Sequence, residues 1–229
     1  MDYGKSFTYA IEDQTWPNKV AIGALITIVP ILNFATAGYM VQITRNVMNQ
    51  QPDRLPEWDD WGKKWTEGLM LFIAHLVYSL PFLLLCCIGS VVAFLPALGG
   101  QSESATNALA GLSITTLCLM GCLGLLYSLA LAVVSPAVTI FYAREGTLSA
   151  CFKIGEIVGF IQRNLNIYLV AGVVFFAGVL AVSFVAGIFN VIPICGTIIG
   201  LVIGLALGFY VALVAGHLYG QVAREAVYA

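Results

Sequence analysis

Charged side chains are scarce in this sequence. Asp, Glu, Lys and Arg make up 10% of the 229 residues, against roughly 25% in soluble domains. Hydrophobic residues make up 60%, and the mean hydropathy is +0.92. This composition predicts an integral membrane protein. The formal net charge of −2 also lacks the basic excess typical of nucleic-acid binding, so we expect no nucleic-acid partner.

Signals for export and catalysis are lacking as well. The chain starts with a polar stretch containing Asp2, Glu12 and Asp13, where a cleavable signal peptide would have a basic start and an apolar core. The apolar segments contain no acidic residue, and the sequence has no phosphate-binding loop. A catalyst needs a base, nucleophile, metal or oxyanion donors within mutual reach. We therefore expect a protein that is not an enzyme.

The six cysteines form no CxxC or Cys/His ligand pattern; they are Cys86, Cys87, Cys118, Cys122, Cys151 and Cys195. We expect free thiols buried as small hydrophobic side chains. The alternative is a metal or disulfide site formed by the pair at 118 and 122 with the pair at 86 and 87, at similar depth on the preceding helix.

Five apolar segments lie at about 20–43, 69–98, 112–142, 165–189 and 197–222. About 20 apolar residues cross the hydrocarbon layer as a helix. The last four segments therefore predict full spans. The first is interrupted from Pro30 to Asn33, which indicates either one kinked helix or a re-entrant pair of half-helices. The predicted fold is a single-domain, all-α, polytopic transmembrane helical bundle.

Three amphipathic stretches, at about 3–14, 56–67 and 147–163, predict interfacial helices. The second lies in the only charge-dense part of the chain, LPEWDDWGKKWTEG at 55–68. On a helix, Trp58, Trp61 and Trp65 share one face and the charged residues share the other. Tryptophan is enriched at the membrane–water boundary, so we expect these three side chains to anchor the protein at the interface.

Lys and Arg set the predicted orientation. The loops at 99–110 and 190–196 contain neither residue, so by the positive-inside rule they face away from the cytoplasm and the C-terminus faces it. A weak internal repeat pairs Pro30-Ile31 with Pro193-Ile194. The second copy goes out and back, so the repeat favours a re-entrant first segment and a cytoplasmic N-terminus.

Two histidines lie within the predicted spans. His75 and His217 are each about seven residues from a cytoplasmic helix end, which places both rings about 10 Å deep. Histidine inside a span is a functional candidate, and two rings at one depth could ligate haem or chlorophyll. Alternatively, each ring bonds a neighbour: Tyr78 or Ser79 for the first, Tyr219 or Gln221 for the second.

Gly200, Gly204 and Gly208 recur at every fourth position of the last span. Small residues at this spacing let helix backbones approach closely. We expect a packing face here, and the partner helix is either internal or from another chain.

The run GYMVQITRNVMNQQPDRLPEWDDWGKKWTEGL, which starts at Gly38, and the last helix GFYVALVAGHLYGQVARE resemble a known family. They are similar to the prokaryotic membrane proteins catalogued as domain of unknown function 4013. The resemblance covers nearly the whole chain and rests chiefly on PEWDDWG at 56–62. It implies a bacterial or archaeal multi-pass protein of the cytoplasmic membrane, with no known reaction and no catalytic residues.

Together these features predict a structural or accessory subunit that packs against other membrane proteins or against itself within the lipid bilayer. A mixed-charge rim at the cytoplasmic face would dock a partner or anionic lipid. Its residues are Asp59, Asp60, Lys63, Lys64, Lys153 and Glu156. The alternatives are a small transporter or lipid-handling protein, since broken helices often build substrate sites, and a haem- or chlorophyll-binding subunit.

Overall fold

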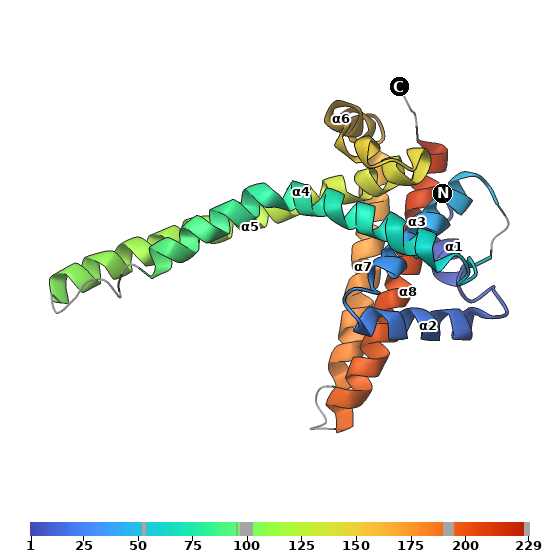
Figure 1. The fold of residues 1–229 in the computed structure, drawn as a ribbon, viewed down its shortest axis with the longest axis horizontal. Helices are drawn as coiled ribbons and strands as arrows, with labels where there is room; N and C mark the ends of the chain where they lie inside the picture. Colours follow the sequence, from blue (N-terminus) through green and yellow to red (C-terminus); the bar gives the residue numbers. More distant parts are fainter. Residues whose placement is uncertain (52–53, 95, 97–102, 190–194, 227–229) are drawn as a thin grey trace. The chain divides into compact units, whose positions relative to one another are not determined.

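The computed structural model describes residues 1–51, 54–94, 96, 103–189 and 195–226. Every regular element in these ranges is helical, which confirms the all-α fold. The α-helices are α1 (Tyr3–Thr8), α2 (Trp16–Ile28), α3 (Phe34–Met48), α4 (Trp61–Ala93), α5 (Glu103–Glu145), α6 (Ile154–Arg163), α7 (Leu165–Phe189) and α8 (Cys195–Glu225). Figure 1 shows them in chain order.

Four of these helices, α4, α5, α7 and α8, are long and apolar enough to cross a membrane. They match the four predicted full spans, and the chain is a membrane protein. The boundaries differ in places. Helix α5 starts at Glu103, so much of the stretch 99–110 that we expected to be a polar loop is helical. Residues 99–102 of that loop and 190–194 of the next turn lie outside the described residues.

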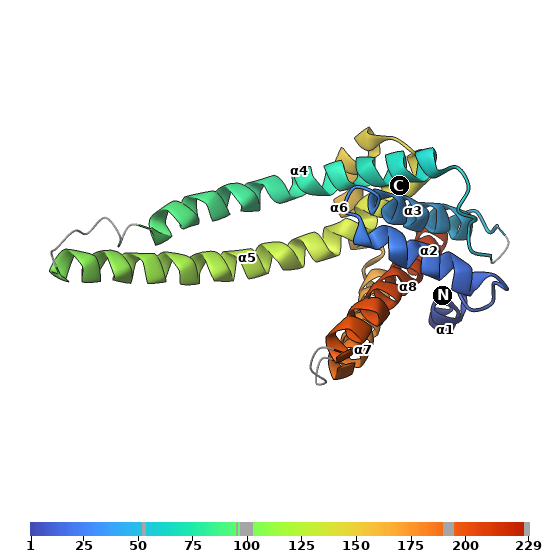
Figure 2. The ribbon, with the colours of Figure 1, turned by 60° about the horizontal axis from the view of Figure 1, so that its bottom comes forward.

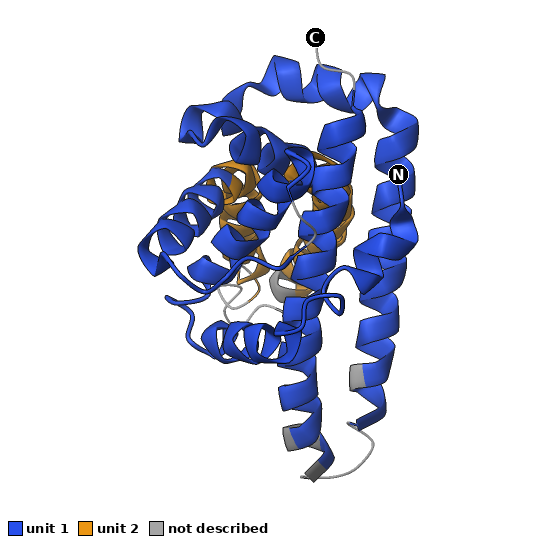
Figure 3. Cartoon of the chain, turned by 90° about the vertical axis from the view of Figure 1, so that its right-hand side faces the viewer, with its two compact units in different colours: residues 1–74, 136–229 blue, residues 75–135 orange. Residues whose placement is uncertain are grey.

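The chain forms two compact units, residues 1–74 with 136–229, and residues 75–135 (Figure 3). In the smaller unit, parts of α4 and α5 pack as a hairpin. The rings of Phe82 and Tyr127 stack with centroids 5.9 Å apart, and the Ser113 hydroxyl donates to the Val92 carbonyl over 2.8 Å. Large apolar side chains such as Leu84 remain exposed on the outside, as expected for helices that face lipid.

The larger unit is assembled on α8. Helices α1, α2, α3 and α7 all pack against it, and its second half, from Phe209 to Ala223, is largely buried. A buried cluster joins Tyr9, Tyr39 and Ile43 to Phe209 and Leu213. In the other half of α8, Leu201 and Val202 are exposed.

Helix α3 lies parallel to the second half of α8 and very close to it. A Cβ added at Gly216 would lie 2.9 Å from the Met40 carbonyl oxygen, and one at Gly220 would lie 2.5 Å from Val47 Cβ. The Thr44 hydroxyl donates to the Gly216 carbonyl over 3.1 Å. Glycine at both positions is therefore what permits the backbones to approach.

The start of α4 crosses α3 in the same manner. A Cβ added at Gly38 would overlap the carbonyl oxygen of Lys64, and one added at Gly68 would overlap that of Phe34. These two glycines hold α3 against α4, as the glycines of α8 hold it from the other side. The run that carries the family resemblance thus forms one tightly packed pair of helices.

Residues 20–43 do not form one continuous helix. Helix α2 has 13 residues and α3 has 15, so at 1.5 Å per residue each is shorter than the roughly 30 Å hydrocarbon layer. The chain turns between Val29 and Asn33, where the Asn33 amide donates to the Val29 carbonyl over 3.0 Å. The break thus coincides with the predicted Pro30 interruption, and the Asn33 carboxamide accepts from the Thr36 hydroxyl over 2.7 Å.

Both described ends of the chain lie at the same end of α8 (Figure 1). The Asp2 amide donates to Gln221 Oε1 over 2.7 Å, and Gln221 Nε2 donates back to the Asp2 carbonyl over 2.8 Å. The amino group of Met1 lies 2.7 Å from Glu225 Oε1. From there α1 runs antiparallel to α8, as far as a hydrogen bond from the Tyr210 hydroxyl to the Phe7 carbonyl.

The predicted amphipathic helix at 56–67 is only half correct. Residues up to Asp60 are not helical, Asp60 has a φ of 42°, and α4 begins at Trp61 and continues without a break into the span. Asp tolerates the left-handed region better than most residues, so it can turn the chain into the helix here. Trp58 therefore does not share a helix face with Trp61 and Trp65.

The other two amphipathic stretches are also shorter than expected. Helix α1 ends at Thr8, and the predicted helix 147–163 is divided at Lys153 into a 3₁₀ helix, Leu148–Phe152, and α6. Lys153 lies at the junction, and its Nζ contacts Glu145 Oε1 at 2.8 Å. Helix α6 buries Ile157 and Phe160 and is the amphipathic part of this stretch.

Candidate functional site

The tryptophans of the charge-dense segment gather on α2 and the turn that follows it. Trp58 Nε1 donates to the Lys19 carbonyl over 3.0 Å, and Trp65 Nε1 donates to the Ile31 carbonyl over 2.7 Å. Trp58 also stacks on Tyr39, with ring centroids 4.4 Å apart, and on Trp61 at 5.0 Å. The segment is therefore an aromatic clamp on the N-terminal helices and not a separate amphipathic helix.

A buried ion pair lies beneath this clamp. Lys19 Nζ donates to Asp13 Oδ2 over 2.9 Å and to the Leu55 carbonyl over 2.9 Å, and it lies 2.7 Å from Glu57 Oε1. Lys19 is 4% exposed and Asp13 is 6% exposed, whereas Glu57 is at the surface. The ammonium group thus fixes the start of α2 to the segment that precedes α4.

The environment of this pair favours both charges. Burial by itself would raise the pKa of Asp13, but hydrogen bonds from Lys19 and Thr15 outweigh it and lower that pKa to about 2. Burial would likewise lower the pKa of Lys19, but its bonds to Glu57 and Asp13 outweigh burial and raise it. Sequence reasoning missed the pair. Its signal was a lone Lys six residues after an Asp, at the border of an apolar segment.

The charged rim is smaller than predicted. Lys64 is 3% exposed and donates to Asp59 Oδ1 over 3.0 Å and to the Asp59 carbonyl over 2.6 Å, so it cannot meet a partner. The close approach of α3 at Gly38 covers it, which a helical-wheel argument cannot foresee. Asp59, Asp60 and Lys63 are exposed as expected.

The rest of the rim lies beyond α5. Lys153 and Glu156 are accessible, but Lys153 is shared between Glu145 at 2.8 Å and Glu156 at 3.9 Å. Both contacts are between solvent-accessible groups and are worth little. They leave Lys153 available to exchange partners.

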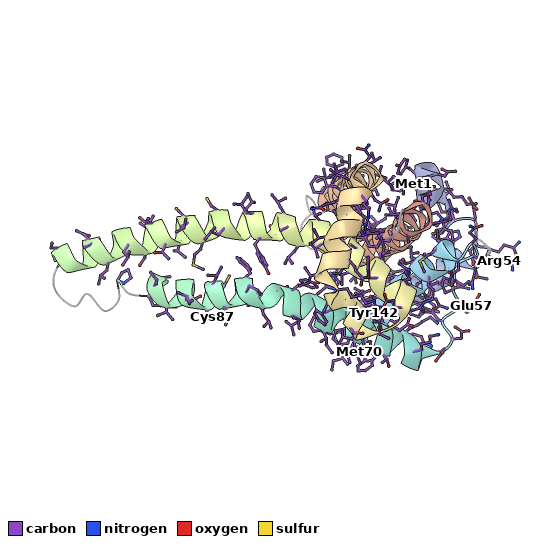
Figure 4. The ribbon with its side chains drawn as sticks, turned by 90° about the horizontal axis from the view of Figure 1, so that it is seen from above. Met1, Arg54, Glu57, Met70, Cys87 and Tyr142 are labelled. Carbon is purple, nitrogen blue, oxygen red and sulfur yellow. The ribbon has the colours of Figure 1, made fainter. Side chains whose placement is uncertain are left out.

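A hollow of about 590 Å³ lies next to Lys63, between the start of α4 and residues 142–148. Met70 and Tyr142, which lie near each other in Figure 4, form part of its wall. Glu67 on the same wall is held by Arg45 Nη1 at 3.0 Å. Lys63 is the exposed cation at this hollow, and it makes no ion pair in the described part of the chain.

The two histidines belong to different units of the chain. His75 Nε2 lies 2.7 Å from the Ser135 hydroxyl, within the smaller unit. His217 Nδ1 lies 2.9 Å from the Ser6 hydroxyl and 3.0 Å from Gln221 Nε2, within the larger unit. Gln221 was one of the neighbours expected for His217, whereas Ser135 was not foreseen. The haem or chlorophyll role of both residues stays a prediction.

The Tyr9 ring packs on the His217 imidazole with centroids 4.5 Å apart. His217 also borders a second hollow, of about 220 Å³, which is lined by both charge signs through Asp2, Lys5 and Arg224.

Two of the three glycines of the predicted packing face of α8 have free space beside them. A Cβ added at Gly204 or Gly208 would meet nothing within 4 Å in the described structure. Gly200, one turn earlier in the helix, is buried. The close contacts of α8 are instead made by Gly216 and Gly220. A partner helix from another chain thus stays a prediction for Gly204 and Gly208.

The cysteines are less buried than expected. Cys87, Cys118 and Cys122 are exposed on the surface of the α4–α5 hairpin, and only Cys151 is buried among the described thiols. Burial raises the pKa of the Cys151 thiol to about 11. No three His, Cys, Asp or Glu side chains of the described residues form a group that could hold a metal ion. The Cys195 side chain lies outside the described residues.

Comparison with known proteins places the chain in a family. The model described as "Protein of unknown function (DUF4013)" matches residues 21–191, well over half of the chain, so the protein belongs to this family. The match covers α2 from residue 21 onward, all of α3 and the aromatic clamp. No curated protein and no solved structure matches the chain.

Proposed function

We propose that this protein is a non-catalytic structural or accessory subunit of a membrane assembly in the cytoplasmic membrane of a prokaryote, with its C-terminus in the cytoplasm. In lipid, helices associate through close packing at small residues and not through the hydrophobic effect. The proposed contact is between the Gly204–Gly208 face of α8 and a helix of another chain.

One observation carries this proposal. Helix α8 uses Gly216 and Gly220 to bring α3 into backbone contact, while Gly204 and Gly208, at the same four-residue spacing, meet open space. The first pair is part of the chain's own core. The second pair is on the half of α8 whose neighbours Leu201 and Val202 are exposed. An unused close-packing face on a spanning helix suits a partner helix.

The rim supports the proposal at the helix ends. Asp60, Lys63 and Glu156 are exposed, and Lys63 borders the 590 Å³ hollow. A partner segment that presents a carboxylate beside an apolar side chain would fit the Lys63 ammonium and the Met70 wall. Because the charges of the rim alternate in sign, we expect the rim to contribute little to the affinity for a partner and mainly to set the partner's orientation.

Purification from native membranes in a mild detergent, followed by identification of co-purifying chains, tests the proposal. We expect defined companions or a homo-oligomer, and we expect Gly204→Leu to lose them. Gly172→Leu on α7 is the matched control, since a Cβ there also meets nothing within 4 Å. Both variants should stay folded by circular dichroism, so that loss of the companion reports on the contact.

Two outcomes would replace the proposal. A monomer that purifies alone from native membranes and moves a solute in liposomes would make the protein a transporter. A haem or chlorophyll absorption band that disappears in the His75→Ala and His217→Ala variants would make it a pigment-binding subunit.

A further inference from the structure

All four tryptophans of the chain are placed around α2. Trp16 starts the helix. Trp58 bonds the carbonyl of Lys19 near its start, and Trp65 bonds the carbonyl of Ile31 just after its end. Trp61 stacks on Trp58. Tryptophan concentrates at the boundary between lipid and water, so indoles at both ends of α2 place both ends at one level of the membrane.

The packing of α2 on α8 agrees with an axis of α2 that lies parallel to the membrane plane. A Cβ at Gly23, in the middle of α2, would run into the ring of Phe209, and Figures 1 and 2 show α2 running across α8. The burial of α8 by the rest of the protein changes at this crossing. It is buried by protein from Phe209 to Ala223, and Leu201 and Val202 beyond the crossing are exposed. Helix α2 thus lies where α8 leaves the core.

The outer face of α2 is apolar and uncovered. On α2, Leu25 is 65% exposed and Ile28 is 57% exposed, while Val20 and Ile26 face the core. Ile31, in the turn after the helix, is 66% exposed. The sequence between Lys19 and Arg45 contains no charged residue. A surface of this kind fits the acyl chains of phospholipids.

The helix geometry gives the depth. Helix α8 has 31 residues, which is longer than the roughly 20 residues that cross the hydrocarbon layer. Counted from Cys195, its first residue, the crossing ends near Val214, and Phe209 then lies about 7 Å inside that boundary. Interfacial helices bury their apolar face about 5–10 Å into this layer.

We propose that residues 16–32 form an in-plane membrane element, which lies flat in one leaflet with Ile22, Leu25, Ile28 and Ile31 among the phospholipid acyl chains. Its two ends are on the same side of the membrane, as in a re-entrant hairpin, but it does not approach the bilayer centre. The inference goes beyond the proposed function and does not rest on it.

Spin labels measure this depth directly. Single cysteines at Ile22, Leu25 and Ile28 would be introduced after alanine replaces every native cysteine except the buried Cys151, and the full chain would be placed in phospholipid nanodiscs. The depth of each label follows from the ratio of its accessibility to oxygen, which concentrates in the lipid, to its accessibility to a water-soluble nickel reagent. If α2 lies in the membrane plane, the three labels should have the same depth to within about 5 Å, the rise of one helical turn. If α2 lies along the membrane normal, the depths of labels 22 and 28 should differ by about 9 Å.

Helix α7 supplies the control. Labels at Val173, Leu180 and Phe184, which are all exposed, should show a steady change of depth with a spread of about 16 Å between the first and the last. Each labelled protein is compared with the wild type by circular dichroism and size-exclusion chromatography before its depth is used.

Three results would overturn the inference. A steady depth gradient along α2 would mean that it penetrates the bilayer. Free access of the nickel reagent to all three positions would mean that the face meets water, and exclusion of both reagents would mean that protein covers it.

The unmodified protein provides a second measurement that needs no substitution. Phospholipids brominated near the headgroup should quench its tryptophan emission more strongly than phospholipids brominated near the chain ends. The reverse order would also refute an in-plane α2.

Discussion

Replacing Lys19 by Met should destabilise the protein more than any other loss of a single charge. Lys19 is 4% exposed, and its ammonium group bonds Asp13, Glu57 and the Leu55 carbonyl. Met has a similar length and keeps the apolar contacts, so the substitution removes the charge and its hydrogen bonds without leaving a large cavity.

The magnitude follows from what remains after the substitution. Asp13 keeps its bonds from the Thr15 amide and hydroxyl, both at 2.7 Å, but it becomes a buried carboxylate without a counter-ion. Removing one partner of a buried pair costs about 3–5 kcal/mol. The Leu55 carbonyl also loses its donor, which frees the segment that carries Trp58. We expect the free energy of unfolding to fall by about 4 kcal/mol.

A double-mutant cycle isolates the pair. Asp13→Asn keeps an oxygen for the Thr15 bonds and removes only the charge. If Lys19 and Asp13 interact as the structure indicates, the two substitutions together should cost less than the sum of each alone, with a coupling of about 1.5–3 kcal/mol. Lys63→Met is the matched control, because Lys63 is exposed and makes no described ion pair; it should change stability by less than about 0.5 kcal/mol.

The assay is unfolding in mixed micelles with increasing sodium dodecyl sulfate, followed by circular dichroism and by tryptophan fluorescence. Because the tryptophans surround α2, the fluorescence reports on the region that the pair stabilises. A loss below about 1 kcal/mol for Lys19→Met, or perfect additivity in the cycle, would refute the claim that this pair holds the start of α2.

Three further predictions follow from the same packing and titration arguments. Gly68→Ala should lower stability by several kcal/mol or abolish folding, since its Cβ would overlap the Phe34 carbonyl. Gly62→Ala, where a Cβ meets open space, should be neutral or slightly stabilising. Unfolding titrations compare the two variants, and equal effects would contradict the close helix contact. The pKa of Asp13 is lowered from 3.8 to about 2, so the carboxylate contributes about 2 kcal/mol to the free energy of unfolding above pH 3.8, and this contribution is lost as the pH falls toward 2. The stability difference between wild type and Asp13→Asn should shrink over that interval. A constant difference would show that the carboxylate is not stabilised. Cys151 is buried and its pKa is raised to about 11, so maleimide should modify it at pH 7.5 only when the protein unfolds; rapid modification of the native protein, measured by mass spectrometry in a background without the other cysteines, would show that the site is open.

The spans were predictable because length and hydropathy are local signals. Helix α7 begins at Leu165 and ends at Phe189, as expected from the sequence. The break near Pro30 was also predictable, since proline and asparagine interrupt an apolar run. Lipid imposes both features on the sequence itself, so no knowledge of tertiary contacts was needed.

Features that depend on distant contacts could not be predicted in this way. Trp58 leaves the expected helix because its indole bonds Lys19, 39 residues away. Lys64 is buried because α3 lies against it at a position where Gly38 has no side chain. The spacing of Gly216 and Gly220 is the same as that of Gly204 and Gly208, and the sequence gives no means to tell which pair packs inside the chain.

The association of α1 with α8 has a consequence for the order of biogenesis. Asp2 and Ser6 find their hydrogen-bond partners in Gln221 and His217, which are 219 and 211 residues later in the chain. During synthesis α1 is made before α8, so these contacts can form only after α8 has been made and inserted. Closure of so long a loop is entropically costly and comes late. Helix α1 therefore docks late, and a chain truncated before α8 would leave Asp2 and Ser6 without these hydrogen-bond partners.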